Sequence, residues 1–292
     1  SIIATDPDLL GLSVPFPGML YGALRIGQRA RQSGIPVLMG GGYVSTELRE
    51  VQEPGLWDCI DGLVYDDGED PLMAWIEHQQ GGVDHRHRTR TANGLLSMTP
   101  SKGFTSAAWY GDLNLSHYLQ VVDSTNPAHR LWSDGRWNKI TLAHGCYWRR
   151  CAFCDIQLDY IARYEPSHVH ELVDQIEELV HTTGIRGFHL VDEAAPPRLL
   201  RDLSIELLRR NVHITWWGNI RFEKAFTPDL CRLMAAAGAV ALTGGLEVAS
   251  DRLLKLMVDT EWLNFDATFL EKLDREFCAN EKNPCVEEGA LD

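Results

Sequence analysis

The chain has 292 residues, a formal net charge of −14 and a hydrophobic share of 45%, a balance typical of globular proteins. This length suffices for two domains, and the acidic character argues against a general nucleic-acid binder. No apolar run is long enough to cross a membrane and no signal peptide opens the chain, so we expect a cytoplasmic protein that does not bind membranes.

The first 80 residues alternate apolar strands with helical patterns. Strands are expected at 9–14, 35–39 and 59–65, and helices at 19–32, 45–52 and 66–79. This alternation predicts an α/β domain with a parallel sheet. Ser13 lies near the end of the first strand, and Gly40, Gly41 and Gly42 follow the second. Glycines there let a ligand approach the backbone, or simply permit a tight strand–helix turn.

Residues 81–138 show no sustained periodicity and are expected to form a linker. Its basic run, with Arg86, Arg88 and Arg90, is typical of a solvated segment. Its second half is rich in aromatic residues, which indicates either packing against a domain or the wall of a substrate cavity.

Residues 139–257 repeat the strand–helix pattern, with strands at 139–143, 188–191, 212–217 and 240–242. Ser167 and Gly184 bracket one helix, and Thr227 with Pro228 opens another. In a parallel barrel all strand ends point to one mouth, and here each one delivers polar groups. These are the cysteine-rich stretch after residue 143, then Asp192 and Glu193, Asn219 and Arg221, and Glu247. The tail, 258–292, lacks periodicity, and we expect 278–292 to be mobile, with Cys278 and Cys285 as free thiols.

Three of the seven cysteines, Cys146, Cys151 and Cys154, are spaced C-x4-C-x2-C. Such a loop can aim three thiolates at one iron–sulfur cluster, and three protein ligands leave one iron of a cubane open for chemistry. Arg149 and Arg150 should favour the thiolate form. Two alternatives remain: a zinc site with His144 as fourth ligand, or a redox pair of Cys151 and Cys154.

This loop resembles the cluster loop of the radical S-adenosylmethionine enzymes, whose usual spacing is C-x3-C-x2-C with an aromatic residue before the last cysteine. Phe153 occupies that aromatic position, and the first gap is one residue longer here. The resemblance implies a partial (βα) barrel with a 4Fe–4S cluster on Cys146, Cys151 and Cys154. It further implies reductive cleavage of S-adenosylmethionine to a 5′-deoxyadenosyl radical, hydrogen abstraction from a small-molecule or peptide substrate, and an electron donor of the flavodoxin or ferredoxin type.

The resemblance extends to the other strand ends. Glu247 and Ser250 match the family's fourth-strand motif, whose glutamate and serine face S-adenosylmethionine. Asp192 and Glu193 stand where the family meets the methionine amino group, and Arg221 is a candidate partner for its carboxylate, with Asn219 beside it. Alternatively, Arg221 pairs only with Glu223, and Asp192 only caps the next helix. His144 and His189, which border the strand ends, are expected to be structural.

Residues 1–80 resemble the C-terminal portion of the Rossmann-like, flavodoxin-like domain that binds cobalamin ahead of many radical S-adenosylmethionine cores. The matching residues are Ser13, the glycines at 40–42 and the later Gly68-Glu69. In that family the serine and glycines lie along the nucleotide tail. The family's D-x-H-x-x-G loop does not occur in this sequence, so either the sequence is a fragment or the domain has lost cobalamin. With cobalamin bound, methyl transfer or rearrangement is expected.

Three other functions compete with this interpretation. The cysteines could belong to a non-catalytic iron–sulfur or zinc protein, or the chain could be an inactive truncated fragment. A radical enzyme that modifies tRNA is the third alternative, but the acidic chain shows no basic RNA-binding domain.

Overall fold

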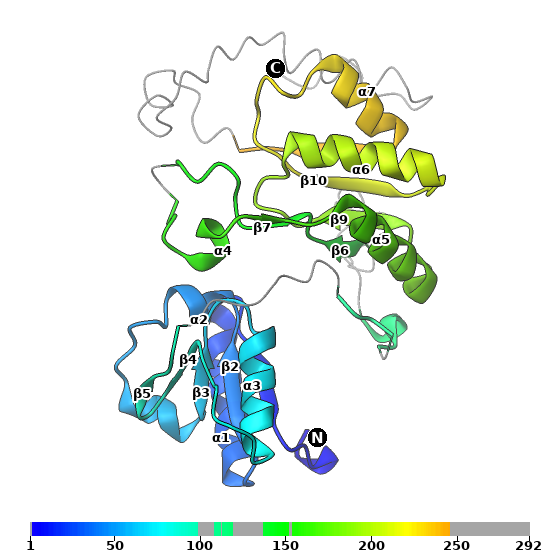
Figure 1. Cartoon of the computed structure of the whole chain (residues 1–292). Helices are drawn as coiled ribbons and strands as arrows, with labels where there is room; N and C mark the ends of the chain where they lie inside the picture. Colours follow the sequence, from blue (N-terminus) through cyan, green and yellow to red (C-terminus); the bar gives the residue numbers. More distant parts are fainter. Residues whose placement is uncertain (1, 99–107, 112, 119–136, 152–153, 246–292) are drawn as a thin grey trace, which may run out of the picture. The chain divides into compact units, whose positions relative to one another are not determined.

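The computed structural model describes residues 2–98, 108–111, 113–118, 137–151 and 154–245 (Figure 1). The chain divides into two compact units, Ser1–Phe104 and Thr105–Asp292. Within the described ranges, every helix is too short or too polar to span a lipid bilayer.

The first unit is built on a five-stranded, Rossmann-like sheet in the order β1-β2-β3-β4-β5. The first three strands are parallel, with Leu12 opposite Met39 and Leu38 opposite Gly62, and the last two are antiparallel. The strands are β1 (Leu10–Ser13), β2 (Val37–Gly40), β3 (Gly62–Val64), β4 (Thr89–Thr91) and β5 (Gly94–Leu95). The parallel part confirms the α/β pattern expected from the sequence.

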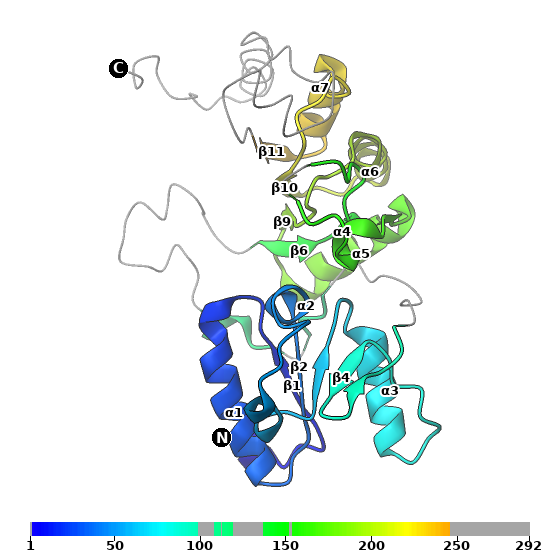
Figure 2. The same ribbon diagram turned by 90° about the vertical axis from the view of Figure 1, so that its left-hand side faces the viewer.

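Helices cover both faces of this sheet (Figure 2). Met39 of β2 belongs to the same buried cluster as Ala30 of α1, whereas the neighbouring Leu38 packs with Trp75 of α3 on the other face. Successive residues of one strand therefore reach opposite faces, as the pleat requires. The helices are α1 (Leu20–Gln32), α2 (Gly42–Thr46) and α3 (Glu69–Gln79), with 3-10 turns at Ile2–Thr5, Pro17–Met19 and Pro54–Asp58.

The sheet continues past residue 80, where the sequence predicts a linker. β4 pairs with β3, and the chain turns at Asn93 into β5. Arg88, expected in a solvated run, is only 3% exposed, and its guanidinium lies 3.2 Å from the Asp66 carboxylate, which also pairs with Arg49. A buried carboxylate needs cationic partners, so charge pairing places this arginine inside the unit.

The second unit contains a four-stranded parallel sheet in the order β11-β10-β9-β6. Three helices pack on one face of it (Figure 1). Phe188, Leu190 and Trp216 point toward these helices and are fully buried. The elements are β6 (Asn138–Ile140), β9 (Gly187–Leu190), β10 (Thr215–Asn219) and β11 (Ala239–Thr243), with α5 (Val169–Thr183), α6 (Pro197–Arg210) and α7 (Pro228–Ala236).

The helix boundaries predicted in the second unit largely hold, whereas the helix predicted at 45–52 in the first unit is wrong, since α2 ends at Thr46. α5 ends at Gly184, whose φ of 70° is the left-handed C-cap expected of glycine, but its N-cap residue is His168 rather than Ser167. The Ser167 N–H instead donates to the carbonyl of Leu142. At α7, the Thr227 hydroxyl accepts from the Leu230 N–H at 3.3 Å, as predicted. The two tail cysteines, Cys278 and Cys285, lie outside the described residues.

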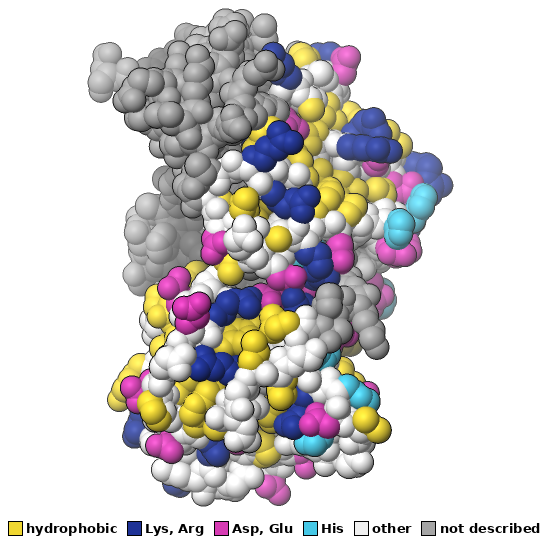
Figure 3. Space-filling model, turned by 60° about the vertical axis from the view of Figure 1, so that its left-hand side comes forward, with side chains coloured by type: hydrophobic (Ala, Val, Ile, Leu, Met, Phe, Trp, Pro, Cys, Tyr) yellow, Lys and Arg dark blue, Asp and Glu magenta, His cyan; other side chains and the backbone are white. Residues whose placement is uncertain are grey.

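The strand predicted at 139–143 divides in two. β6 joins the parallel sheet, and β7 (Ala143–His144) turns away to pair antiparallel with β8 (Glu165–Pro166). The remaining short elements are α4 (Asp159–Ala162) and the 3-10 turn Leu115–His117. In Figure 3, basic and acidic side chains are intermixed over the visible described surface, so the negative charge is not gathered in one patch there.

Candidate functional site

The cysteine loop begins at the end of β7, where the backbone is held from both sides of Gly145. The His144 Nδ1–H donates to the Arg163 carbonyl at 2.8 Å, and the Cys146 N–H donates to the Ile161 carbonyl at 3.2 Å. Gly145 has a φ of 72°, and a Cβ there would lie 2.2 Å from the Arg163 oxygen. Only glycine fits this close approach, so residue 145 fixes the path of the loop.

His144 is committed to structure, as expected. Its Nδ1 is used by the Arg163 carbonyl, and its Nε2 lies 3.0 Å from the Arg163 guanidinium. Within the described residues, the three cysteine sulfurs do not form a set in which all lie within 4.8 Å of one another. A tetrahedral zinc ion holds its sulfur ligands about 2.3 Å from the metal, which needs a tighter group. Because both ring nitrogens of His144 have protein partners, the fourth ligand that the zinc alternative needs is already engaged.

The three loop cysteines are half-buried, and none of them forms a disulfide. The Cys154 N–H donates to the Cys151 carbonyl at 3.2 Å, which makes a tight turn between these two ligand candidates. Burial raises the pKa of the Cys154 thiol, and the charges of Cys146, Glu193 and Asp155 raise it further. The charges of Cys146 and Glu193 therefore act on the Cys154 thiol.

The expectation that Arg149 and Arg150 favour the thiolate is wrong for Cys154, whose pKa is raised. The Arg149 guanidinium donates to the Ala162 carbonyl, and that of Arg150 lies over the Trp148 ring at 5.1 Å. Both cations support the loop. Deprotonation of the thiols would come from a bound metal, which removes the proton of a coordinating thiol.

A second brace joins the loop to the chain after β10. The Arg221 guanidinium stacks on the Trp148 ring, 3.4 Å from its centroid, and pairs with the Glu223 carboxylate at 3.0 Å. Burial raises the pKa of the adjacent Tyr147 phenol, and the charge of Glu223 adds to this shift. Arg221, which the sequence assigns to a ligand carboxylate, thus contacts Trp148 and Glu223 of the protein itself, and Glu223 is the residue named in the alternative interpretation.

Asp192 follows β9 and is almost fully buried, at 2% exposed. Its carboxylate accepts hydrogen bonds from the backbone N–H groups of Leu142 and Ala143 at 2.9–3.1 Å. Burial raises its pKa to about 6, against the lowering effect of these bonds. The N-cap position of α6 is Pro196, so Asp192 fixes the approach to the cysteine loop rather than capping that helix.

Two further predicted residues lie at the same edge of the sheet. Glu193 is exposed and close enough to Cys154 to raise the pKa of its thiol. The Asn219 amide donates to the Asp192 carbonyl at 3.4 Å and accepts from the Thr243 hydroxyl at 2.5 Å. The parallel strand ends thus converge, as predicted. Phe153, Glu247 and Ser250 lie outside the described residues.

Sequence reasoning missed three residues that support the loop: Tyr147, Trp148 and Arg163. One signal in the sequence points to Tyr147 and Trp148. The first gap between the cysteines is one residue longer than usual, and it consists of two adjacent aromatic residues followed by two arginines. Aromatic residues next to cations are typical of stacked pairs.

The first unit has a cavity of about 440 Å³ at the carboxyl ends of its parallel strands. Ser13, Gly40, Gly41 and the later Gly68 and Glu69 line it. Gly41 has a φ of 106°, and a Cβ there would lie 2.8 Å from the Val14 nitrogen, so this glycine is required by the turn and also borders the cavity. Gly42 instead begins α2.

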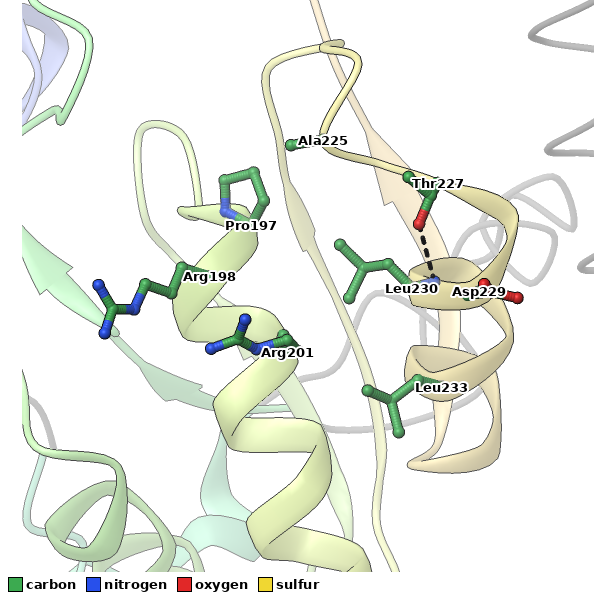
Figure 4. Close-up of a pocket in the computed structure, with 8 residues that line it drawn as sticks. All are labelled: Pro197, Arg198, Arg201, Ala225, Thr227, Asp229, Leu230 and Leu233. Carbon is green, nitrogen blue, oxygen red and sulfur yellow. Dashed lines mark hydrogen bonds between the residues drawn. The ribbon is translucent and has the colours of Figure 1, made fainter.

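Another cavity, of about 410 Å³, lies between the N-terminal ends of α6 and α7 (Figure 4). Its polar groups serve local structure: Thr227 caps α7, and Arg201 pairs with Asp202 at 2.7 Å. It lies in the helical layer, on the opposite side of the sheet from Lys139, His189 and Trp217.

The chain matches no protein-family model. The anaerobic magnesium-protoporphyrin IX monomethyl ester cyclase of Cereibacter sphaeroides is 24% identical over 274 residues, which cover 87% of this chain and 42% of the cyclase. The cytidylyl-2-hydroxyethylphosphonate methyltransferase of Streptomyces wedmorensis is 21% identical over 301 residues, covering 90% and 54%. The chain thus spans about half the length of these curated relatives.

Among solved structures, the apo form of the cobalamin-dependent S-adenosylmethionine radical enzyme OxsB has a TM-score of 0.59 to this chain at 16% identity. The match covers 88% of this chain and 38% of OxsB, and it shows a shared fold. Taken with the two sequence relatives, it makes the chain a distant homologue of the cobalamin-dependent radical S-adenosylmethionine enzymes.

Proposed function

We propose that the second unit is the core of a radical S-adenosylmethionine enzyme, a partial (βα) barrel in which Cys146, Cys151 and Cys154 hold a 4Fe–4S cluster. The observation that carries this proposal is the single braced loop that presents three thiols at the carboxyl edge of a parallel sheet. The donor set suits a cluster with one open iron. When bound, the cluster supplies the electron that cleaves S-adenosylmethionine to a 5′-deoxyadenosyl radical, which takes hydrogen from a substrate.

The chain's own residues bind S-adenosylmethionine and hold the cysteine loop in place. We assign Glu193, an exposed carboxylate whose charge raises the pKa of the Cys154 thiol, to the ammonium group of the methionine moiety. Asp192 and Asn219 keep the strand ends around it in register through their hydrogen bonds. Arg221 holds the loop by stacking on Trp148. Glu247 and Ser250 complete the proposed S-adenosylmethionine contacts on the grounds of sequence resemblance, and Phe153 completes the cluster loop.

For the first unit we propose that the cavity lined by Ser13, Gly40 and Gly41 takes the nucleotide tail of cobalamin. Its glycine-lined wall fits a ligand that lies directly on the backbone. With cobalamin bound, methyl transfer or rearrangement are the reactions that the proposal includes. The names of the two relatives, a methyltransferase and a cyclase, support this range.

Anaerobic reconstitution with iron and sulfide, followed by dithionite and S-adenosylmethionine, tests the second unit. We expect about four irons per chain, the visible absorbance that gives iron–sulfur proteins their brown colour, and formation of 5′-deoxyadenosine from S-adenosylmethionine. Cys151→Ala should lose all three, whereas Cys59→Ala, which removes a thiol of the first unit, should retain them. A flavodoxin or ferredoxin is the donor that we propose in place of dithionite. Four irons without 5′-deoxyadenosine would favour the non-catalytic alternative, and iron retention by Cys151→Ala would contradict the ligand assignment.

Equilibrium dialysis with hydroxocobalamin tests the first unit. Ser13→Trp should fill the cavity and abolish binding. Ser33→Trp, on the exposed end of α1, is the matched control and should bind like the wild type. Equal binding by both variants would place the cofactor elsewhere.

A further inference from the structure

Three side chains form a row across the face of the second sheet that lies opposite its helices. Lys139 of β6, His189 of β9 and Trp217 of β10 stand at one register level on adjacent parallel strands. Their neighbours along the strands, such as Ile140, Leu190 and Trp216, point the other way into the helical core. The row is therefore on the face that the helices leave uncovered.

The geometry within the row is tight. The Lys139 ammonium lies 2.9 Å from Nδ1 of His189, and the imidazole stacks on the Trp217 ring at a centroid distance of 3.7 Å and an interplanar angle of 6°. A lysine ammonium can only donate, so Nδ1 accepts and the proton of the neutral ring is on Nε2. That Nε2 is buried and has no hydrogen-bond partner among the described residues.

The Lys139 ammonium also has no counter-ion within the part of the chain that the structure describes. Among the described carboxylates, none forms an ion pair with Lys139. Lys139 is exposed, and partial desolvation lowers its pKa; burial together with the lysine charge lowers that of the half-buried His189 to about 4. The buried Nε2–H of His189 needs an acceptor, because an unpaired buried donor is rare in folded proteins. An anion that accepts from Nε2–H would also be attracted by the nearby Lys139 charge.

We propose that Lys139, His189 and Trp217 bind an oxyanionic group, a carboxylate or a phosphate, of the molecule on which the enzyme acts. The assignment of this oxyanion to a substrate rests on the function proposed above; the binding itself does not. His189 is three residues before Asp192, roughly 10 Å along the chain, and Asp192 is at the sheet edge where the proposed cluster would be. An oxyanion at His189 would therefore belong to a part of the substrate several bonds away from the carbon that reacts. Trp217 holds the imidazole flat and gives the site an aromatic wall.

The test is a titration of cluster-free protein with sodium phosphate and, separately, sodium succinate, followed by NMR of labelled histidine at constant ionic strength in chloride. His189→Gln identifies the His189 signal. We expect a saturable shift of that signal and a rise in the His189 pKa, since a bound anion stabilises the protonated ring. Lys139→Met should weaken binding at least about tenfold, because the ammonium on Nδ1 keeps the ring proton on Nε2 and supplies positive charge near the anion, and Lys139→Arg should restore most of it. Lys224→Met, which removes an exposed lysine after β10, should change nothing.

Saturation by phosphate alone or by succinate alone supports the proposal and identifies the group. A shift that chloride reproduces, or that survives Lys139→Met, overturns it. Formation of 5′-deoxyadenosine is measured separately. Oxyanion binding without 5′-deoxyadenosine would support the oxyanion site and count against the proposed function. Formation of 5′-deoxyadenosine without oxyanion binding would support the proposed function and contradict the oxyanion site.

Discussion

The contact between Arg221 and Trp148 gives the sharpest prediction. It distinguishes a brace for the cysteine loop from a ligand for S-adenosylmethionine. Replacing Arg221 with Gln removes the ion-pair partner of Glu223, whose side chain is 10% exposed, and the nearer of the two cations that lie over the Trp148 ring. Exposed ion pairs contribute about 0–1 kcal/mol and removal of one partner of a buried pair costs about 3–5 kcal/mol. This half-buried pair falls between those ranges.

We therefore expect Arg221→Gln to lower the free energy of unfolding by about 2 kcal/mol from the pair and by about 1 kcal/mol from the stacking. Arg221→Lys keeps the charge but loses the flat stack, so it should lose about 1 kcal/mol. Arg201→Gln removes a partner from an exposed pair and should change stability by less than about 0.5 kcal/mol.

Urea unfolding of the cluster-free chain measures these values, and a double-mutant cycle with Trp148→Leu isolates the stacking term. A coupling of about 1 kcal/mol is expected, and iron content after reconstitution should fall in Arg221→Gln because the loop is loosened. Additivity within about 0.5 kcal/mol would mean that the two side chains do not interact. Wild-type stability with at least tenfold weaker binding of S-adenosylmethionine would refute the brace and restore the role that the sequence suggested.

Three further predictions follow from single groups. Gly145→Ala should abolish iron binding, measured by iron analysis, because its Cβ would lie 2.2 Å from the Arg163 oxygen and φ is 72°; normal iron content would contradict this. Arg88→Met should lower the free energy of unfolding of the first unit by about 3 kcal/mol in a urea titration, because it uncovers the buried Asp66 carboxylate; a change below about 1 kcal/mol would mean that Arg49 alone suffices. The His189 pKa is lowered from its ordinary value of 6.5 to about 4, so the unfolded chain binds the extra proton as pH falls between these values. The wild type should therefore lose about 1 kcal/mol relative to His189→Gln over that window, after allowance for partial exposure, and parallel pH profiles of stability would count against it.

Much of the fold was predictable because its signals are local. The apolar stripe of α5, the cap at Thr227 and the glycine stop at Gly184 each lie within a few residues of the boundary that they specify. The convergence of the strand ends follows from parallel topology, so the positions of Asp192, Glu193 and Asn219 were predictable as a group.

The interactions that depend on distant residues were not predictable. Arg88 is inside because Asp66, 22 positions earlier, needs a cation, and hydropathy does not encode that need. Likewise, β4 and β5 are short and complete a sheet edge that no periodic pattern marks. The brace between Trp148 and Arg221 joins a loop to a strand end by a stacking contact, and the spacing of cysteines carries no information about it.

The Asp192 carboxylate accepts hydrogen bonds from the backbone N–H groups of Leu142 and Ala143, which precede it by 50 and 49 positions. The stretch that carries the thiols can therefore take its shape only once β6 and β9 have come together. Under the proposed function, iron delivery would therefore have to follow the pairing of β9 with β6, and not merely the synthesis of the cysteine loop. Substitutions that weaken β9 would accordingly impair loading of the proposed cluster before they change the overall fold.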